Sequence, residues 1–113
     1  MRVTGNALDR LRKICLALPE AAEGTSVHHP SFKVRSKTFV MFADGNGRPA
    51  AWIKSTIETQ TELLAEADRF FKPPYLGPKG WVGVYLDHSP DWTEIAELVN
   101  DGWRLAAPKK LLR

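Results

Sequence analysis

The hydrophobic period of the chain changes once in its first half, and that change predicts a helix followed by strands. Near the N-terminus, Leu8, Leu11, Cys15 and Leu18 recur at spacings of three and four, which gives one apolar face of a helix. Pro19 ends this helix because a proline ring cannot continue the hydrogen-bond ladder. From residue 26 onward the period is two, which is typical of strands that bury one face.

Residues 26–54 are predicted to form an antiparallel meander of three strands. In the first strand, Phe32 and Val34 alternate with Lys33 and Arg35. A tight turn, RSK, follows this strand, and the next turn, DGNG, is a strong hairpin signal because Asn and Gly tolerate positive φ. The second strand lies between these turns, and PAAWIK after DGNG is the third.

Two helices and one strand are predicted after the meander. Ser55 with Glu58 three residues later matches a capping box, which starts a short helix. The stretch RFFKPPYLGPKG holds too many prolines for a central strand, whereas WVGVYLD alternates well enough for the last strand. Ser89 or Asp91 caps a final helix that ends before Pro108. This order predicts an α+β domain of two layers, an antiparallel sheet with helices packed on one face.

Length and composition fit one globular domain over residues 1–113. Hydrophobic residues make up 43% of the chain and charged residues 26%, with a formal net charge of +3. The one cysteine, Cys15, excludes an internal disulfide and suits a reducing compartment. No apolar run is long enough to span a bilayer. We therefore expect a soluble cytoplasmic protein, with a monomer as the default and the oligomeric state left open.

Positively charged side chains on the predicted meander give the first candidate site. By alternation, Lys33 and Arg35 share one face of a strand, and a hairpin with a basic outer face can lie along a phosphate backbone. The same residues also suit the ordinary solvated face that a one-sided sheet must have. The candidate phosphate-binding residues are Lys33, Arg35, Lys37, Arg48, Lys54 and Lys79.

The aromatic and proline-rich stretch 69–87 gives the second candidate site. A purely structural interpretation buries Phe70, Phe71 and Trp81 against the last helix. A functional one leaves aromatic faces free to stack on bases while a lysine meets a phosphate. A small-molecule site between the sheet and this stretch is the main alternative, with His29, Tyr75, Lys79 and Trp81 as its residues. A protein-interaction domain that uses an exposed sheet or sheet edge is a further alternative.

No pattern in the chain names a reaction. A phosphate loop, a nucleophile elbow and an interpretable carboxylate pair are all missing from the sequence. His28 and His29 are adjacent, and adjacent strand residues point to opposite faces, so the two imidazoles do not suit one metal ion. Cys15 on the apolar helix face suits a small hydrophobe. We expect no metal, no cofactor and no catalytic residues, although the choice between binding module and enzyme stays open.

Several segments together resemble one known family. LPE after the first helix, HHPSFKV with KTFVMF, AWIK, FFKPPYLGPKGWVGVYLD and the closing WRLAAPKKL are similar, in this order, to the MmcQ/YjbR family over about residues 6–112. The resemblance implies a CyaY-like α+β fold and a DNA-binding role with a double-wing motif. Weak, salt-dependent binding to DNA is the expected activity. Contact between about four cations and phosphates would give a slope of log K against log salt of roughly −3 to −4.

Overall fold

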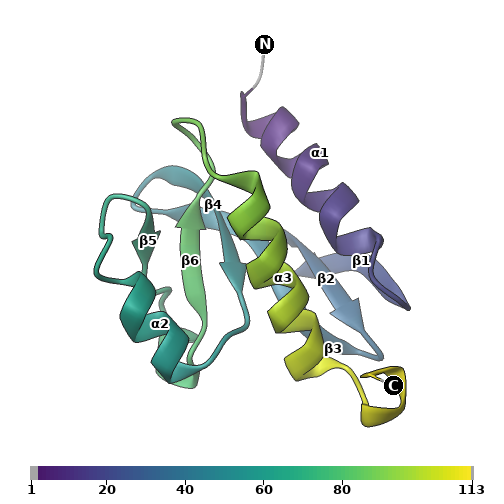
Figure 1. Ribbon diagram of the computed structural model, residues 1–113. Coiled ribbons are helices and arrows are strands. Elements are labelled where there is room, and N and C mark those ends of the chain that lie inside the picture. Colours follow the sequence, from purple (N-terminus) through teal and green to yellow (C-terminus); the bar gives the residue numbers. More distant parts are fainter. Residues whose placement is uncertain (1–2, 113) are drawn as a thin grey trace.

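A computed structural model describes residues 3–112 of the chain, and it confirms the α+β class. One six-stranded sheet is covered on one face by helices (Figure 1). The elements in chain order are α1 (Val3–Leu16), β1 (Ala21–Ser26), β2 (His29–Val34), β3 (Lys37–Gly45), β4 (Arg48–Ile53), α2 (Ile57–Leu63), β5 (Phe70–Phe71), the 3₁₀ turn η1 (Gly77–Lys79), β6 (Val82–Tyr85), α3 (Trp92–Ala106) and the 3₁₀ turn η2 (Lys109–Leu112).

The sheet has the strand order β1-β2-β3-β4-β6-β5, and every neighbouring pair is antiparallel. The three strands of the predicted meander are β2, β3 and β4, and β1 adds a fourth, so the meander begins at Ala21 rather than at residue 26. The sequence gives no sign of β1 because AAEGTS has no alternating large apolar residues. It is held instead by its ladder with β2, from Ala21 opposite Val34 to Ser26 opposite His29.

All three hairpins of the meander turn through two residues at positive φ, although only one carries the expected glycine. Asn46 and Gly47 join β3 to β4, with φ of 51° and 77°. In the β1–β2 and β2–β3 turns, every position at positive φ is a residue other than glycine: Val27, His28, Arg35 and Ser36. Such turns match the right-handed twist of the strands, so the ladders impose a conformation that these residues rarely adopt on their own.

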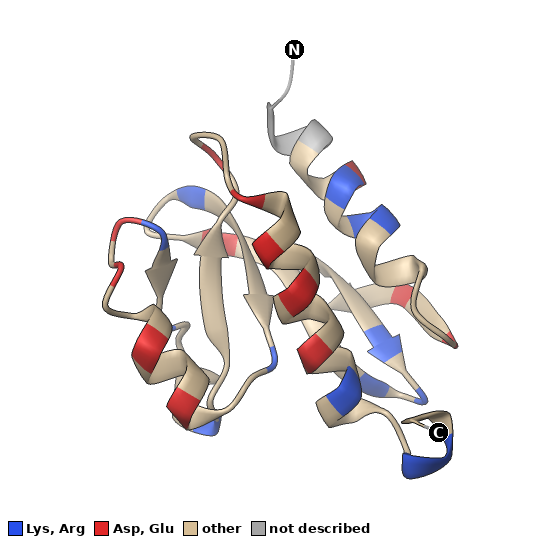
Figure 2. Cartoon of the chain, viewed as in Figure 1, with Lys and Arg blue, Asp and Glu red and all other residues tan. Residues whose placement is uncertain are grey.

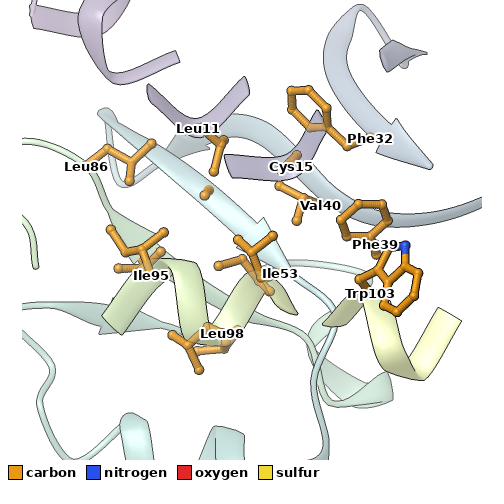
Figure 3. Packing of buried hydrophobic residues seen from close by; sticks show 14 of the residues in the cluster. Leu11, Cys15, Phe32, Phe39, Val40, Ile53, Leu86, Ile95, Leu98 and Trp103 are labelled. Atoms are coloured by element: carbon orange, nitrogen blue, oxygen red, sulfur yellow. The ribbon is translucent and has the colours of Figure 1, made fainter. Parts of the chain in front are cut away.

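Side chains from the helices and from one face of the sheet form the core (Figure 3). Leu11 and Cys15 of α1 are fully buried in this core, as the helical spacing predicts. From α3, Ile95 and Val99 meet the sheet. Each such buried aliphatic side chain contributes about 1.5–3 kcal/mol from its removal from water. The sheet supplies Phe32, Val34, Phe39, Val40, Ala51, Ile53, Phe70, Val82 and Val84.

Caps fix where two of the helices begin. Asp91 starts α3 as expected, because its carboxylate accepts a hydrogen bond from the backbone N–H of Glu94 at 3.1 Å. For α2 the predicted capping residue is one position too early. Thr56, not Ser55, accepts from the N–H of Thr59 at 3.2 Å. The side-chain chemistry is the same, so the pattern alone cannot separate the two positions.

The other face of the sheet is apolar and largely covered by its own side chains, where the sequence predicts a charged surface. Register places Met41, Trp52, Gly83 and Phe71 in one row across four strands. The Phe71 ring lies so close over Gly83 that a Cβ there would overlap it, and Phe71 also stacks on Tyr85 with ring centroids 4.9 Å apart. No broad basic face is therefore present here, and the candidate cations must be sought at the ends of the strands.

Candidate nucleic-acid interface

The antiparallel register gathers most of the predicted cations at one end of the sheet. Val34 pairs with Lys37, and Ile53 pairs with both Val40 and Val82. The β2–β3 turn, the end of β4 and the start of β6 therefore lie at the same end. We call this the basic end, and it holds the predicted residues Lys33, Arg35, Lys37, Lys54 and Lys79. Figure 2 shows basic positions at the turns and strand ends on this side.

The C-terminal segment adds further positive charge to the basic end. The last turn of α3 lies there, because Gly102 packs closely against the backbone oxygen of Lys54. Lys110, in η2, is near enough to Glu20 to help lower the pKa of that carboxylate. In Figure 2 the basic positions of η2 lie beside the β2–β3 turn. Arg104, Lys109 and Lys110 were not in the predicted set, although the sequence places them together near its C-terminus.

Arg35 differs from its predicted placement and is partly neutralised. The strand ends at Val34, and Arg35 occupies the following turn with φ of 50°, so it does not share a strand face with Lys33. Its guanidinium donates two hydrogen bonds to the Glu20 carboxylate. This hydrogen bonding lowers the pKa of Glu20 and raises the pKa of Arg35. Arg35 therefore brings less free charge to the basic end than its neighbours do.

Lys54 and Lys79 flank Trp81 where β4 ends and β6 begins. Lys54 Nζ lies 5.9 Å from the centre of the Trp81 ring, which is itself only 4% exposed. Such a cation over an indole face is an attractive arrangement. Lys79 ends the short 3₁₀ turn η1 and is exposed. The Trp81 ring is therefore buried beside Lys54, and it offers no open surface on which a ligand could stack.

A buried amide holds the backbone of this loop in place. Gln60 of α2 is 4% exposed, and its Nε2 donates to the carbonyl oxygens of Gly77 at 2.8 Å and of Trp81 at 2.6 Å. An unsatisfied buried carbonyl is costly, so these bonds tie η1 to α2. Sequence patterns give no signal for this residue, because one polar residue on a short amphipathic helix ordinarily faces water.

Arg48 lies at the far end of the strands from the other predicted cations. It pairs with Gly45 across the β3–β4 hairpin, where its guanidinium donates to Asp87 at 2.7 Å and stacks on the Tyr85 ring at 3.7 Å. The hydrogen bond from Arg48 lowers the pKa of Asp87. We call this region, with the end of β6 and the first turn of α3, the opposite end. The positive charge of Arg48 is therefore already balanced by Asp87 of the same chain.

A small polar cavity of about 360 Å³ also lies at the opposite end. Its cations are paired: Arg48 with Asp87, and Arg69 with Glu66 and Glu94. Partly exposed ion pairs of this kind contribute about 1 kcal/mol or less each, and they leave little net charge for a ligand. The other residues around the cavity include Asp68, Val84, Tyr85, His88, Ser89, Pro90, Asp91 and Ile95.

The four residues of the predicted small-molecule site do not converge on one cavity. His29 begins β2 and lies at the opposite end, whereas Lys79 lies at the basic end. Trp81 is buried and Tyr75 is 90% exposed. None of the four lines the polar cavity at the opposite end. The geometry therefore gives this alternative no assembled site.

Other chemistry considered from the sequence finds no assembled group in the part of the chain that the structure describes. Cys15 is buried, and burial raises the pKa of its thiol far above the ordinary value, so it is not a ready nucleophile. Between residues 3 and 112, no cluster of His, Cys, Asp and Glu could hold a metal ion. Helices long and apolar enough to cross a membrane are also absent from this range.

An open groove lies between α1 and α3, away from the exposed sheet and sheet edge on which the protein-interaction alternative rests. It encloses about 840 Å³, and the Arg10 guanidinium stacks on the Trp92 ring at 4.8 Å within it. Ile14 and Ala96 form apolar parts of its walls. Glu97, Asn100 and Asp101 line the same groove, so its charge is opposite to that of the basic end.

Comparisons with known proteins agree with this fold. The YjbR family model matches residues 16–105 of the chain. Protein DR2400 of Deinococcus radiodurans, whose crystal structure carries a domain of the DUF419 family model, is similar in structure with a TM-score of 0.75 and 25% sequence identity. That match covers 87% of this chain and 76% of the DR2400 chain. No curated protein matches the sequence.

Proposed function

We propose that this chain, which belongs to the YjbR family, is a non-enzymatic module that binds DNA through phosphate contacts at its basic end. The observation that carries the proposal is the convergence of Lys37, Lys54 and Lys79 on one end of the sheet, from segments far apart in sequence. Among residues 3–112, none of these three ammonium groups forms an ion pair. They remain available to an anionic partner.

The shape of this region suits a phosphate backbone better than a base edge. Lysines and arginines at turns and strand ends can contact phosphates, and phosphate contacts position a protein on DNA without reading its sequence. Between residues 7 and 112, neither a helix nor a strand pair presents a row of amide or guanidinium groups for the major groove. We therefore expect weak binding with little sequence preference, which increases strongly as the salt concentration falls.

A salt titration with charge-neutralised variants tests the proposal. Lys37→Gln with Lys54→Gln removes two cations from the basic end, and we expect affinity for DNA to fall roughly 10- to 100-fold near 0.1 M salt. The slope of log K against log salt should decrease in magnitude by about 1.5–2, because two phosphate contacts are lost. Fluorescence anisotropy of labelled duplex and single-stranded DNA at several salt concentrations measures both quantities.

The matched control removes the same charge from elsewhere. Arg10→Gln with Arg48→Gln lowers the net charge equally, but these side chains stack on Trp92 and Tyr85 and lie away from the basic end. We expect this variant to bind almost as well as the parent. Equal loss in both variants would mean that only net charge matters, and no salt-dependent binding by the parent would end the proposal.

A further inference from the structure

The most unusual side chain on the surface is Tyr75, at the tip of the loop between β5 and β6. It is 90% exposed, and its backbone has φ of 65°. The N–H of Leu76 donates to the carbonyl of Pro74 at 2.6 Å, which closes a γ-turn around Tyr75. A γ-turn with its central residue at positive φ is rare and strained, and large residues other than glycine seldom occupy it.

The loop that carries Tyr75 is rigid at its base. Pro73 is fully buried, and its carbonyl accepts a hydrogen bond from the N–H of Gly77 at 2.8 Å. Gly80, at φ of 97°, packs against the backbone of Ser55, where a Cβ would lie 2.9 Å from the carbonyl oxygen. With the two bonds from Gln60, these contacts fix both ends of the loop. The ring is therefore held out in water by a fixed support.

Folding alone does not account for this arrangement. An aromatic ring stabilises a fold when it leaves water, and the Tyr75 ring remains in water. A glycine or asparagine would adopt the same backbone conformation with less strain. The fold thus presents an aromatic face that it does not use, as a binding residue would require.

The loop that carries Tyr75 has basic residues and no acidic ones, whereas the helix α2 beside it carries Glu58 and Glu62. Between Arg69 and Leu86 the sequence has no acidic residue, and Lys72 and Lys79 on either side of the tip are exposed. β5 runs antiparallel to β6, with Phe71 opposite Gly83, so the loop leaves β5 at the basic end. Neighbouring strands are about 4.8 Å apart, so the loop where it leaves β5 and Lys37 at the start of β3 are three spacings apart across the sheet, roughly 14 Å, and further apart along the strands. One extended strand of nucleic acid can contact both.

We propose that Tyr75 is a stacking platform for an unpaired nucleobase, with Lys72 and Lys79 on the adjoining phosphates. This inference rests on the proposed function and specifies its ligand as DNA with a single-stranded segment. Bases inside a duplex already stack on each other, so only an unpaired base can place its face on the tyrosine ring. Every base has such a face, which makes the contact tolerant of sequence.

Two substitutions at Tyr75 separate stacking from folding. Tyr75→Asn removes the ring but keeps a residue that tolerates positive φ, so the fold should persist. Tyr75→Phe keeps the ring and removes only the hydroxyl. For a short oligothymidylate, we expect Tyr75→Asn to lose about 5- to 150-fold in affinity, in line with roughly 1–3 kcal/mol per stacked base. Tyr75→Phe should bind within about twofold of the parent, and blunt duplex affinity should change little in either variant.

A fluorescent base analogue gives a direct readout. In an oligonucleotide that contains 2-aminopurine, the parent protein and Tyr75→Phe should change the emission of that base on binding, and Tyr75→Asn should not. If the parent binds DNA and Tyr75→Asn retains full affinity for the single strand, the stacking inference is wrong and the proposed function survives. If the parent binds neither duplex nor single strand at low salt, both fail, and a protein partner becomes the better explanation of the exposed ring.

Discussion

The two ends of the sheet treat positive charge in opposite ways. At the opposite end, Arg48 and Arg69 are held by carboxylates from other elements, and Arg48 also covers an aromatic ring. At the basic end, Lys37 and Lys79 extend into water with no ion pair from any described residue. Cations of the first kind serve the fold, and those of the second kind are free for a partner.

The difference also shows how the net charge of +3 should be understood. A modest total conceals a separation, because acidic residues gather on α2 and α3 whereas basic ones lie on α1, at the turns and near the C-terminus (Figure 2). A field of this kind attracts an anion to the basic end and repels it from α3 and α2. The arrangement of charge is therefore more informative about a partner than its sum.

The largest effect should come from removal of the buried amide that supports the basic end. Gln60→Leu removes the Gln60 donor from the buried carbonyl of Trp81 and leaves that of Gly77 with the N–H of Gly80 alone, so we expect the free energy of unfolding to fall by about 1–3 kcal/mol. Urea denaturation measures this. Glu62→Gln, on the exposed side of the same helix, is the control and should change stability little. If Gln60→Leu left the free energy of unfolding unchanged, the loop would not be anchored through this side chain.

A smaller loss of stability should follow when the Arg48–Asp87 ion pair at the opposite end is removed. Arg48→Met removes the partner of Asp87 and the cation over the Tyr85 ring, so thermal stability at neutral pH should decrease while DNA affinity stays within about twofold. Arg48 was one of the cations predicted to contact phosphate, so a large loss of binding would restore it to that role and would contradict the contrast between the two ends.

The stability difference between the parent and Arg48→Met should also depend on pH. Because Arg48 lowers the pKa of Asp87 below its ordinary 3.8, the pair stabilises the fold at pH values above about 3.8. This contribution is lost as the pH falls through the lowered pKa. Thermal melts from pH 7 down to pH 2 should therefore show the two proteins approaching each other at the acid end. A constant difference over this range would place the effect in packing instead.

The smallest effect should be a gain in affinity for DNA. Glu20→Gln releases Arg35 from its ion pair and removes a negative charge from the basic end. We expect affinity for DNA to increase about two- to fivefold, with a salt slope larger in magnitude by up to about 0.9. The same salt titration measures it, and Glu97→Gln in the α1–α3 groove is the matched control. Unchanged affinity would mean that Arg35 does not face the bound nucleic acid.

The helices and the meander could be predicted because their signals are local. Leu11 and Cys15 at helical spacing, and Phe32 and Val34 at strand spacing, are buried as their periods require. β1 was missed because its polar, small residues take their structure from the ladder with β2. The candidate cations can be listed from the sequence, but their grouping cannot be predicted from it, since it depends on which strand ends coincide.

The sequence by itself determined the α+β class, the turn after Asp44 and the start of α3 at Asp91, because period, turn residues and caps act over a few neighbouring positions. The tertiary structure alone decided that Arg35 and Arg48 are neutralised within the chain, whereas Lys54 and Lys79 meet at one end. It also decided that Tyr75 remains in water. Pairing and exposure depend on distances across the sheet, and these exist only after the strands have assembled.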